Sequence, residues 1–407
     1  MPRKDNFSRR DFLKTGVAAG ITSILVPTES IGKIANPSGS EKLVVPTRPF
    51  GKTGIEISCL SLGSWPSSSN VLLLKQALNW GVTHWDTADN YGYGRSEKVI
   101  GKFFAKYPET RRKVFLVTKS TPRDPEDMDR MLHRSLERLQ TDYIDLYFAH
   151  NIKTIKELSN KIRAWADKAK AAGKIRLFGF STHSNMEDCM LAAAKLGYVD
   201  GIMMTYNYRL MHKSRMKEAV SACSEAGIGL TAMKTQGGGQ INAHNETELK
   251  LAGRFIREGF TDKQAKLMAV WEEPNIASIC SYMPNLTILM SNVAAALKRT
   301  SFSAHDRGLL VQFANETAFS YCAGCTAICE RTNDGKVPIG DIMRYLMYYH
   351  SYGECEQARL LYAQLSSDIR ERLNNFDYSL AEKKCPQRVP IRRLMREACR
   401  ILAFMEE

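Results

Sequence analysis

Residues 114–150 read VFLVTKSTPRDPEDMDRMLHRSLERLQTDYIDLYFAH and contain two short apolar runs that flank a longer amphipathic segment. Val114–Lys119 and Tyr143–His150 are rich in β-branched and aromatic residues, which is typical of buried strands. Pro125–Gln140 repeats its apolar residues with a helical period. The segment therefore predicts a strand, a helix and a second strand, with the polar residues Lys119 and His150 at the two strand ends.

The same alternation extends along the chain on both sides of this unit. Six more strands are expected, at Glu56–Leu62, Thr83–Thr87, Arg176–Ser181, Gly201–Tyr206, Gly229–Lys234 and Ala277–Tyr282. Seven more helices are expected, at Val71–Trp80, Ser96–Lys106, Thr154–Ala171, Met186–Leu196, Lys213–Glu225, Asp262–Trp271 and Thr287–Leu297. Eight alternating units predict an α/β protein with a closed parallel (β/α)8 TIM barrel.

An open, doubly wound sheet is the alternative arrangement for alternating strands and helices. Such a sheet normally carries a glycine fingerprint directly after its first strand, where the loop holds a dinucleotide pyrophosphate. In this chain the turn reads Gly63-Ser-Trp-Pro66, so the barrel is favoured.

Four polar residues lie at or just past the ends of three neighbouring strands: Asp86, Tyr91, Lys119 and His150. The carboxyl ends of the strands form one rim of a parallel barrel, and the active sites of such barrels lie on that rim. We therefore expect the four side chains to converge on one site.

Residues 48 to about 297 resemble the aldo/keto reductase family. The segments RPFGKTG at 48–54 and LSLG at 60–63 resemble the family's opening hairpin and first strand, and WDTADNYGYGRSE at 85–97 resembles its signature from Asp to Tyr. The segments VTK at 117–119, DYIDLYFAH at 142–150, GKIR at 173–176 and GFS at 179–181 match further landmarks in order and spacing. The resemblance implies a catalytic tetrad of Asp86, Tyr91, Lys119 and His150.

The chemistry of carbonyl reduction gives each tetrad residue an expected role. Hydride addition to a carbonyl requires a proton for the developing alkoxide, and Tyr91 is the candidate acid. The Lys119 ammonium is expected to lower the pKa of the phenol from about 10, and Asp86 is expected to hold Lys119 charged and oriented. His150 is expected to donate a hydrogen bond to the carbonyl oxygen as a neutral imidazole whose tautomer a neighbour fixes.

The resemblance also implies a nicotinamide cofactor, NAD(P)(H). The family usually holds the carboxamide with Ser-Asn after the fifth strand and Gln on the sixth, and the corresponding residues here are Ser181, Thr182 and Met203. The other candidate contacts are Tyr206 as a platform for the nicotinamide ring and Asn292 beside the adenosine.

Phosphate recognition gives a weaker pattern. Lys234, followed by Gly237–Gly239, is a candidate for the pyrophosphate, although a run of three glycines is also typical of a flexible loop. Tyr282–Ile288 contains none of the basic residues with which the family often holds a 2′-phosphate. The sequence therefore predicts no preference for NADPH.

A cysteine cluster lies beyond residue 300. YCAGCTAIC at 321–329 has C-x2-C-x3-C spacing, and Cys385 precedes a proline. Cys322, Cys325, Cys329 and Cys385 suit a [4Fe–4S] cluster, and some aldo/keto reductases carry a ferredoxin-like extension of this kind. Zinc and disulfides are the alternatives, and Cys355 or Cys399 can replace Cys385 as the fourth ligand.

The expected domains are a leader at 1–36, the barrel at 42–300 and a helical iron–sulfur module at 301–407. SRRDFLK at 8–14 matches the twin-arginine signal, whose machinery exports folded proteins. The sequence therefore predicts a periplasmic protein, or one anchored to the membrane by an uncleaved leader. The formal charge of +14 comes without an aromatic-basic nucleic-acid motif, so no nucleic-acid partner is expected.

These patterns together predict an exported oxidoreductase that interconverts a small-molecule carbonyl and an alcohol, with a redox partner as a candidate for its cluster. The first alternative is an electron-transfer protein that keeps the barrel as a scaffold. The second is a non-redox lyase or epimerase that uses the same Tyr and Lys to move protons. The loops that select the substrate carry no recognisable pattern.

Overall fold

A computed structural model describes residues 44–64, 70–242, 245–298 and 301–403. They belong to one compact unit, Val44–Glu407. The expected leader at 1–36, with its twin-arginine pattern, lies outside the described residues. Within the described part of the chain, no helix is both long enough and apolar enough to cross a membrane.

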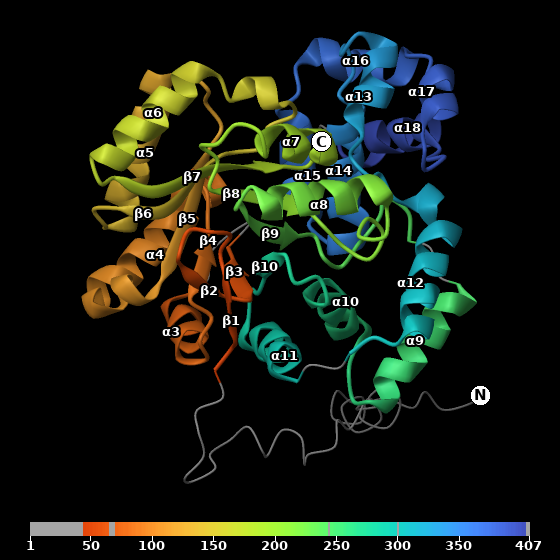
Figure 1. The fold of residues 1–407 in the computed structure, drawn as a ribbon. Helices are drawn as coiled ribbons and strands as arrows, with labels where there is room; N and C mark the ends of the chain where they lie inside the picture. The colour runs from red at the N-terminus through yellow and green to blue at the C-terminus, as the bar shows by residue number, and fades with distance from the viewer. Residues whose placement is uncertain (1–43, 65–69, 243–244, 299–300, 404–407) are drawn as a thin grey trace, which may run out of the picture. The chain divides into compact units, whose positions relative to one another are not determined.

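Eight parallel strands close into a barrel, in the order β10-β3-β4-β5-β6-β7-β8-β9, and helices surround it (Figure 1). The strands are β3 (Leu60–Gly63), β4 (His84–Asp86), β5 (Phe115–Ser120), β6 (Ile144–Ala149), β7 (Ile175–Thr182), β8 (Gly201–Thr205), β9 (Gly229–Met233) and β10 (Ile276–Tyr282). The prediction of a closed (β/α)8 barrel is confirmed.

Helices follow the strands as the sequence predicts. Around the barrel they are α3 (Val71–Asn79), α4 (Arg95–Lys106), α5 (Pro125–Leu139), α6 (Asn160–Ala171), α7 (Met186–Ala193), α8 (Ser214–Glu225), α9 (Glu246–Arg257), α10 (Asp262–Trp271) and α11 (Leu286–Leu297). Three short 3-10 turns are η1 (Tyr91–Gly94), η2 (Pro108–Lys113) and η3 (Ile155–Glu157). The sequence analysis missed α9, which is an extra helix between β9 and α10.

The first predicted strand, Glu56–Leu62, is wrong as a single element. Its first half is β2 (Glu56–Ser58), which pairs antiparallel with β1 (Thr47–Pro49) in a hairpin, and only the second half, β3, enters the barrel. The chain changes partners at Cys59, whose amide donates to the carbonyl of Pro46. A continuous apolar run therefore spans two strands of different sheets.

The hairpin closes the amino-terminal end of the barrel. Phe50 is fully buried there, in a cluster with Ile57 and side chains inside the barrel. The first residues of β8 and β9 are glycines, and a Cβ added at Gly201 or Gly229 would lie 2.7 or 2.5 Å from the Phe50 ring. Glycine at these two positions leaves the space that the ring fills.

The chain beyond residue 300 is helical, as expected. Its elements are α12 (Ala304–Glu316), η4 (Ala318–Ser320), α13 (Thr326–Cys329), η5 (Glu330–Asn333), α14 (Ile339–Tyr352), α15 (Cys355–Ala363), α16 (Ser367–Asn375), α17 (Ser379–Lys384) and α18 (Ile391–Ile401). Residues from Cys329 onward form a hydrophobic core of their own. We call residues 322–403 the C-terminal module.

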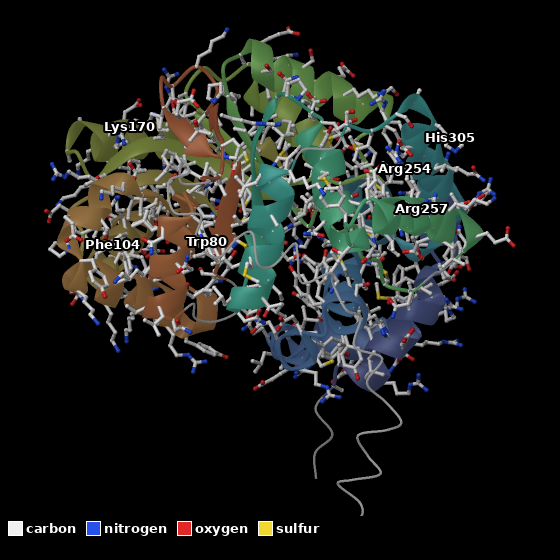
Figure 2. The ribbon with its side chains drawn as sticks, turned by 90° about the horizontal axis from the view of Figure 1, so that it is seen from below. Trp80, Phe104, Lys170, Arg254, Arg257 and His305 are labelled. Atoms are coloured by element: carbon white, nitrogen blue, oxygen red, sulfur yellow. The ribbon has the colours of Figure 1, made fainter. Side chains whose placement is uncertain are left out.

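Residues before the C-terminal module pack with the barrel core. Phe302 and Phe313 belong to the barrel's hydrophobic cluster, and the Phe302 ring lies 4.9 Å from that of Phe255 on α9. Figure 2 shows Arg254 and Arg257 of α9 beside His305 of α12, and Arg254 forms an ion pair with Asp306. The extra helix α9 therefore connects the barrel to the chain that leads into the module.

The C-terminal module contacts the carboxyl-terminal rim of the barrel through the loops after β6, β7 and β9. Lys153 forms an ion pair of 2.7 Å with Asp341, and Asn185 donates to Thr326 over 3.0 Å. Gln240 donates to the carbonyl of Met343 and accepts from the amide of Cys322. The module therefore lies next to the rim on which a barrel carries its active site.

Candidate active site

Asp86 and Lys119 form an ion pair inside the rim. Asp86 ends β4 and Lys119 lies near the end of β5, so the barrel register places the two side chains next to each other. Lys119 Nζ lies 2.6 Å from Asp86 Oδ1 and donates to the carbonyl of Thr87 over 2.7 Å. Burial raises the pKa of the Asp86 carboxyl, and the adjacent ammonium opposes that rise.

Tyr91 begins η1, directly after β4. The next two residues, Gly92 and Tyr93, have left-handed backbone angles, which turn the chain back into α4. The Tyr91 ring centroid lies 5.0 Å from Lys119 Nζ, and the Tyr91 and His150 rings meet edge to face at 5.8 Å. The structure therefore brings all four expected tetrad residues together.

The expected direction of the Tyr91 pKa shift is wrong. Burial raises the pKa of the phenol well above its ordinary value, and the Asp86 charge adds to the rise. The ammonium of Lys119 is already neutralised by Asp86 at contact distance, so its charge does not outweigh the loss of water around Tyr91. The phenol is therefore protonated at neutral pH.

His150 follows β6, and its backbone amide donates to the carbonyl of Ser120. Burial lowers the pKa of the imidazole well below its ordinary value, and the Lys119 charge lowers it further, so the ring is neutral. Its Nδ1 atom is buried and has no hydrogen-bond partner among the described residues. The expected neighbour that fixes the tautomer is therefore not found at Nδ1.

Ser181 and Thr182 end β7, next to the tetrad strands. The Ser181 hydroxyl accepts from the amide of Asn151 and keeps its own proton for a ligand. The Thr182 hydroxyl instead lies 2.8 Å from the carbonyls of Ile152 and Ser184, which compete for its one proton, and it accepts from the Ser184 amide. Of the two candidate carboxamide contacts, only Ser181 retains a free hydrogen-bonding group.

The remaining cofactor candidates follow β8 and β9 or lie in α11. Tyr206 is 1% exposed and belongs to the hydrophobic core, so its ring offers no open face for a nicotinamide. Asn292 donates its amide to Ser281 over 3.0 Å, which leaves its carbonyl oxygen for a ligand. Lys234 donates to the Tyr348 hydroxyl over 3.0 Å, so its side chain reaches the C-terminal module.

The glycine loop after β9 is also in contact with later parts of the chain. A Cβ at Gly238 would lie 2.7 Å from Ser351 of α14, and one at Gly239 would lie 2.1 Å from the Ser320 carbonyl. Ser351 also donates to the Gly239 carbonyl over 2.6 Å. Close packing against α14 and η4 therefore explains these two glycines without a pyrophosphate.

Sequence reasoning missed the residues that α14 contributes to the site. Arg344 donates to the Asn151 side chain over 3.3 Å, beside His150, and Tyr348 bonds to Lys234 as described above. Arg344 interrupts a buried apolar run that includes Met343, Leu346 and Met347. A lone arginine in such a run was the available signal, because charged residues are rarely buried without a partner.

The four candidate ligand cysteines line one cavity in the C-terminal module. Cys322, Cys325, Cys329 and Cys385 share its wall with apolar side chains such as Ile339 and Val389. All four thiols are free. Burial raises the pKa of Cys325 to about 11 and that of Cys329 to about 12, and the Cys385 thiol contributes to both shifts.

No set of three or more His, Cys, Asp or Glu side chains in the described residues is arranged to hold a single metal ion. Cys355 and Cys399 do not line the cysteine cavity; Cys355 contacts the Tyr349 carbonyl, and Cys399 contacts Tyr362. Cys385 is therefore the fourth thiol that shares the cavity with the C-x2-C-x3-C segment.

Comparison with known proteins identifies the barrel. Residues 60–300 match the model of the aldo/keto reductase family. The chain belongs to this family. An oxidoreductase of Bacillus subtilis, YrpG, is 30% identical over 47% of the chain and 67% of its own length. The aldo-keto reductase yakc [NADP(+)] of Schizosaccharomyces pombe is 31% identical over 48% of the chain and 62% of its own length.

Solved aldo-keto reductases have the same barrel. The thermostable enzyme Tm1743 is 26% identical, with a TM-score of 0.55 over 66% of this chain and 99% of its own. The aldo-keto reductase AKR11C1 of Bacillus halodurans has a TM-score of 0.54 over 66% of this chain and 96% of its own, at 22% identity, and supports the fold alone. The chain is therefore an oxidoreductase of the aldo/keto reductase family, and the family match ends before the C-terminal module.

Proposed function

We propose that this protein interconverts a carbonyl and an alcohol on a small molecule, with hydride exchanged with NAD(P)(H). One observation carries the proposal: the Asp86–Lys119 ion pair, the Tyr91 phenol and the neutral His150 ring lie together at one end of the barrel. This set provides a proton donor, a fixed positive charge and a second hydrogen-bond donor around one oxygen atom.

In the reducing direction, Tyr91 donates its proton to the substrate oxygen while negative charge develops there. The raised pKa of Tyr91 keeps the phenol protonated until that moment. The Lys119 ammonium then stabilises the phenolate, and Asp86 keeps the ammonium in place. A neutral His150 can donate a second hydrogen bond to the same oxygen, because one of its ring nitrogens carries a proton.

A bound nicotinamide supplies or accepts the hydride. We propose Ser181 and Asn292 as residues that hold it, because each retains a hydrogen-bonding group, whereas the Thr182 hydroxyl bonds within the protein and the Tyr206 ring is buried in the core. The Schizosaccharomyces pombe relative carries NADP(+) in its name. The absence of Lys and Arg from Tyr282–Ile288 supports a protein without a preference for NADPH.

The experiment compares two tyrosines of the same 3-10 turn. NADH and NADPH oxidation is followed by absorbance with a panel of aldehydes and ketones. Tyr91→Phe should lower turnover by about a hundredfold or more, the usual contribution of a general acid. Tyr93→Phe, which removes the hydroxyl of a side chain that is 71% exposed, should leave turnover unchanged. Equal turnover in both variants would exclude Tyr91 as the acid.

We further propose that Cys322, Cys325, Cys329 and Cys385 hold a [4Fe–4S] cluster, which supplies one-electron transfer. Their shared cavity supports a cluster, because four thiols that line one space match the four-cysteine ligand set of a [4Fe–4S] cluster. Metal binding to these cysteines requires their thiolate form, so it releases protons.

Iron and acid-labile sulfide analysis of anaerobically purified protein tests this proposal. We expect about four of each per chain. Cys385→Ser should lose most of the iron, and Cys399→Ser, which changes a thiol outside the cavity, should retain it. A single zinc ion per chain instead of iron would overturn the cluster.

The location of the protein is a separate proposal. The SRRDFLK pattern at 8–14 supports export by the twin-arginine machinery to the periplasm, or to the membrane with the leader retained. Fractionation of cells that express Arg9→Lys/Arg10→Lys should find the protein inside the cytoplasm, whereas an Arg3→Lys control should be exported. Export of the double variant would contradict this route.

Electron transfer through a redox partner is the second candidate function. Its support is the position of Cys322 and Ala323, which line the cysteine cavity and also the cavity beside Lys234 and Arg344. A reducible cluster in a protein that binds neither NADH nor NADPH would favour this function over hydride transfer.

A further inference from the structure

A second cavity lies between the barrel rim and α14. Its wall includes Lys234, His183 and Thr205 from the rim and Arg344 from α14. We call it the rim cavity. Three nitrogen-bearing side chains thus face one small space, and none of them belongs to the tetrad.

Lys234 is held in an unusual backbone conformation at this cavity. Its φ of 55° lies in the left-handed region, which a lysine rarely adopts, and its carbonyl accepts from Gly237 N and Asn207 Nδ2. Its Nζ lies 3.0 Å from the Tyr348 hydroxyl and 3.3 Å from His183 Nδ1. Among the described residues, no carboxylate lies within ion-pair distance of this ammonium.

Arg344 connects the rim cavity to the tetrad. Its side chain is 14% exposed, and it donates to Asp341 over 2.9 Å and to Asn151, the residue after His150, over 3.3 Å. Asp341 also pairs with Lys153 at 2.7 Å. Glu330 is a second carboxylate that acts on Lys153 and Arg344. Two carboxylates therefore face the three cations Lys153, Arg344 and Lys234, and Lys234 forms an ion pair with neither of them.

The same charges act on the tetrad. Burial lowers the pKa of His150 and of His183, and Lys234 and Arg344 both lower them further. Burial also lowers the pKa of Lys234 well below its ordinary value, and the Arg344 charge adds to that decrease. The rim cavity and the tetrad therefore share one electrostatic environment in which cations lack sufficient counter-charge.

We propose that Lys234 and Arg344 bind a carboxylate or phosphate group of the substrate, so that this enzyme acts on acidic carbonyl compounds. The inference rests on the proposed function, because it places the anionic group of the same substrate whose carbonyl oxygen meets Tyr91 and His150. The planar guanidinium of an arginine can donate two parallel hydrogen bonds to a carboxylate or a phosphate. A bound anion would also supply the negative counter-charge that Lys234 lacks.

The pyrophosphate of a dinucleotide is the other source of such an anion. The Arg344 contact with Asn151 favours the substrate, since it places the guanidinium beside the residue that follows His150, and the proposed function places the reacting carbonyl at His150. Arg344 also comes from a helix outside the 60–300 match to the family. The substrate's acidic group is therefore the occupant that the geometry favours.

Calorimetric titration with benzoate and with its neutral isostere benzamide tests the site without turnover. The full chain should bind benzoate at least about tenfold more tightly, and Lys234→Met or Arg344→Met should each remove about ten- to hundredfold of benzoate affinity. Arg344→Lys, which retains the charge, should keep part of the preference if the other variants unfold. Arg396→Met on α18, an exposed control, should change neither affinity. Equal binding of benzoate and benzamide by the unaltered chain would overturn the proposal.

One further measurement distinguishes a substrate anion from the pyrophosphate of a dinucleotide. Another distinguishes failure of the anion site from failure of the proposed function. Fluorescence titration with NADH and NADPH should give unchanged affinities in Lys234→Met and Arg344→Met, and a loss parallel to that of benzoate would assign the site to the dinucleotide and overturn the inference. The ratio of kcat/KM for 4-carboxybenzaldehyde to that for benzaldehyde should fall in both variants. Benzoate binding that depends on Lys234 and Arg344 in a chain without turnover would retain the site and reject the proposed function.

Discussion

At the residue scale, sequence identified the tetrad because each of its members has a distinctive chemical type at a fixed distance from a strand end. Asp86, Lys119 and His150 occupy the ends of consecutive strands, and parallel register makes such positions neighbours. Sequence did not give the pKa of Tyr91, since the shift depends on burial and on the pairing of Lys119 with Asp86. The motif shows which side chains come together. It does not show whether burial or the Lys119 charge has the larger effect on the pKa of Tyr91.

The effects of replacing Asp86 and Lys119 on the free energy of unfolding should depend strongly on each other. Lys119→Met leaves a buried carboxylate without its partner, and the free energy of unfolding should fall by about 3–5 kcal/mol. Asp86→Asn/Lys119→Met, which removes both charges, should be less destabilised than the sum of the two single variants. Urea denaturation measures all four proteins, and strictly additive losses would show that the two groups do not interact.

His84 predicts a specific dependence of stability on pH. Burial lowers the pKa of this barrel-interior histidine to about 3, whereas the unfolded chain protonates at its ordinary value. The unfolded state therefore binds more protons between these two values. This contribution to stability is complete above about pH 6.5 and decreases by about 1.4 kcal/mol for each pH unit below it.

The matched variant is His84→Gln, which does not titrate. Its free energy of unfolding, measured with urea at about pH 7 and about pH 5, should fall less between the two pH values than that of the unaltered chain. An identical decrease in both proteins would mean that His84 does not remain neutral in the folded state.

At the scale of elements, the alternation of strands and helices was sufficient to predict the barrel, and the expected strands lie within one or two residues of the observed ones. The exception is Glu56–Leu62, because a change of partner at Cys59 leaves no mark on an apolar run. The extra helix α9 was also missed, since Glu246–Arg257 falls outside the regular alternation.

The packing of Phe50 against the glycines at the amino-terminal end of the barrel predicts the effect of adding a side chain there. A Cβ at Gly229 would lie 2.5 Å from the Phe50 ring, so Gly229→Ala should lower the free energy of unfolding by about 1–3 kcal/mol. Gly308→Ala in exposed α12, where a Cβ meets no atom within 4 Å, should be neutral or raise it by up to about 1 kcal/mol. Chemical denaturation measures the free energy of unfolding of both variants. Equal changes would contradict the close packing of Phe50 against Gly229.

At the scale of the whole molecule, cysteine spacing indicated a separate helical module but not its position. Contacts between the loops after β6, β7 and β9 and residues 322–351 are formed by side chains far apart in sequence, such as Lys153 with Asp341 and Gln240 with Cys322. No local pattern encodes such pairs. The arginine that completes the rim cavity was missed for the same reason.

The C-terminal module also forms part of the surroundings of the active site. Lys234, which the sequence suggested for a pyrophosphate, contacts Tyr348 of the module instead. The barrel supplies the tetrad, and α14 supplies part of the wall beside it. Selection of the substrate is therefore expected to depend on both parts of the chain.

The most direct measurement follows a deuterium atom. NADH and NADPH in which both hydrogens at C4 of the nicotinamide are replaced by deuterium are incubated with the full chain and 4-carboxybenzaldehyde, and the alcohol is analysed by mass spectrometry. Hydride transfer predicts one deuterium atom on the alcohol carbon, and Tyr91→Phe should form almost none of this product. Alcohol formed without deuterium would show that the electrons take another route, and would contradict the proposed function.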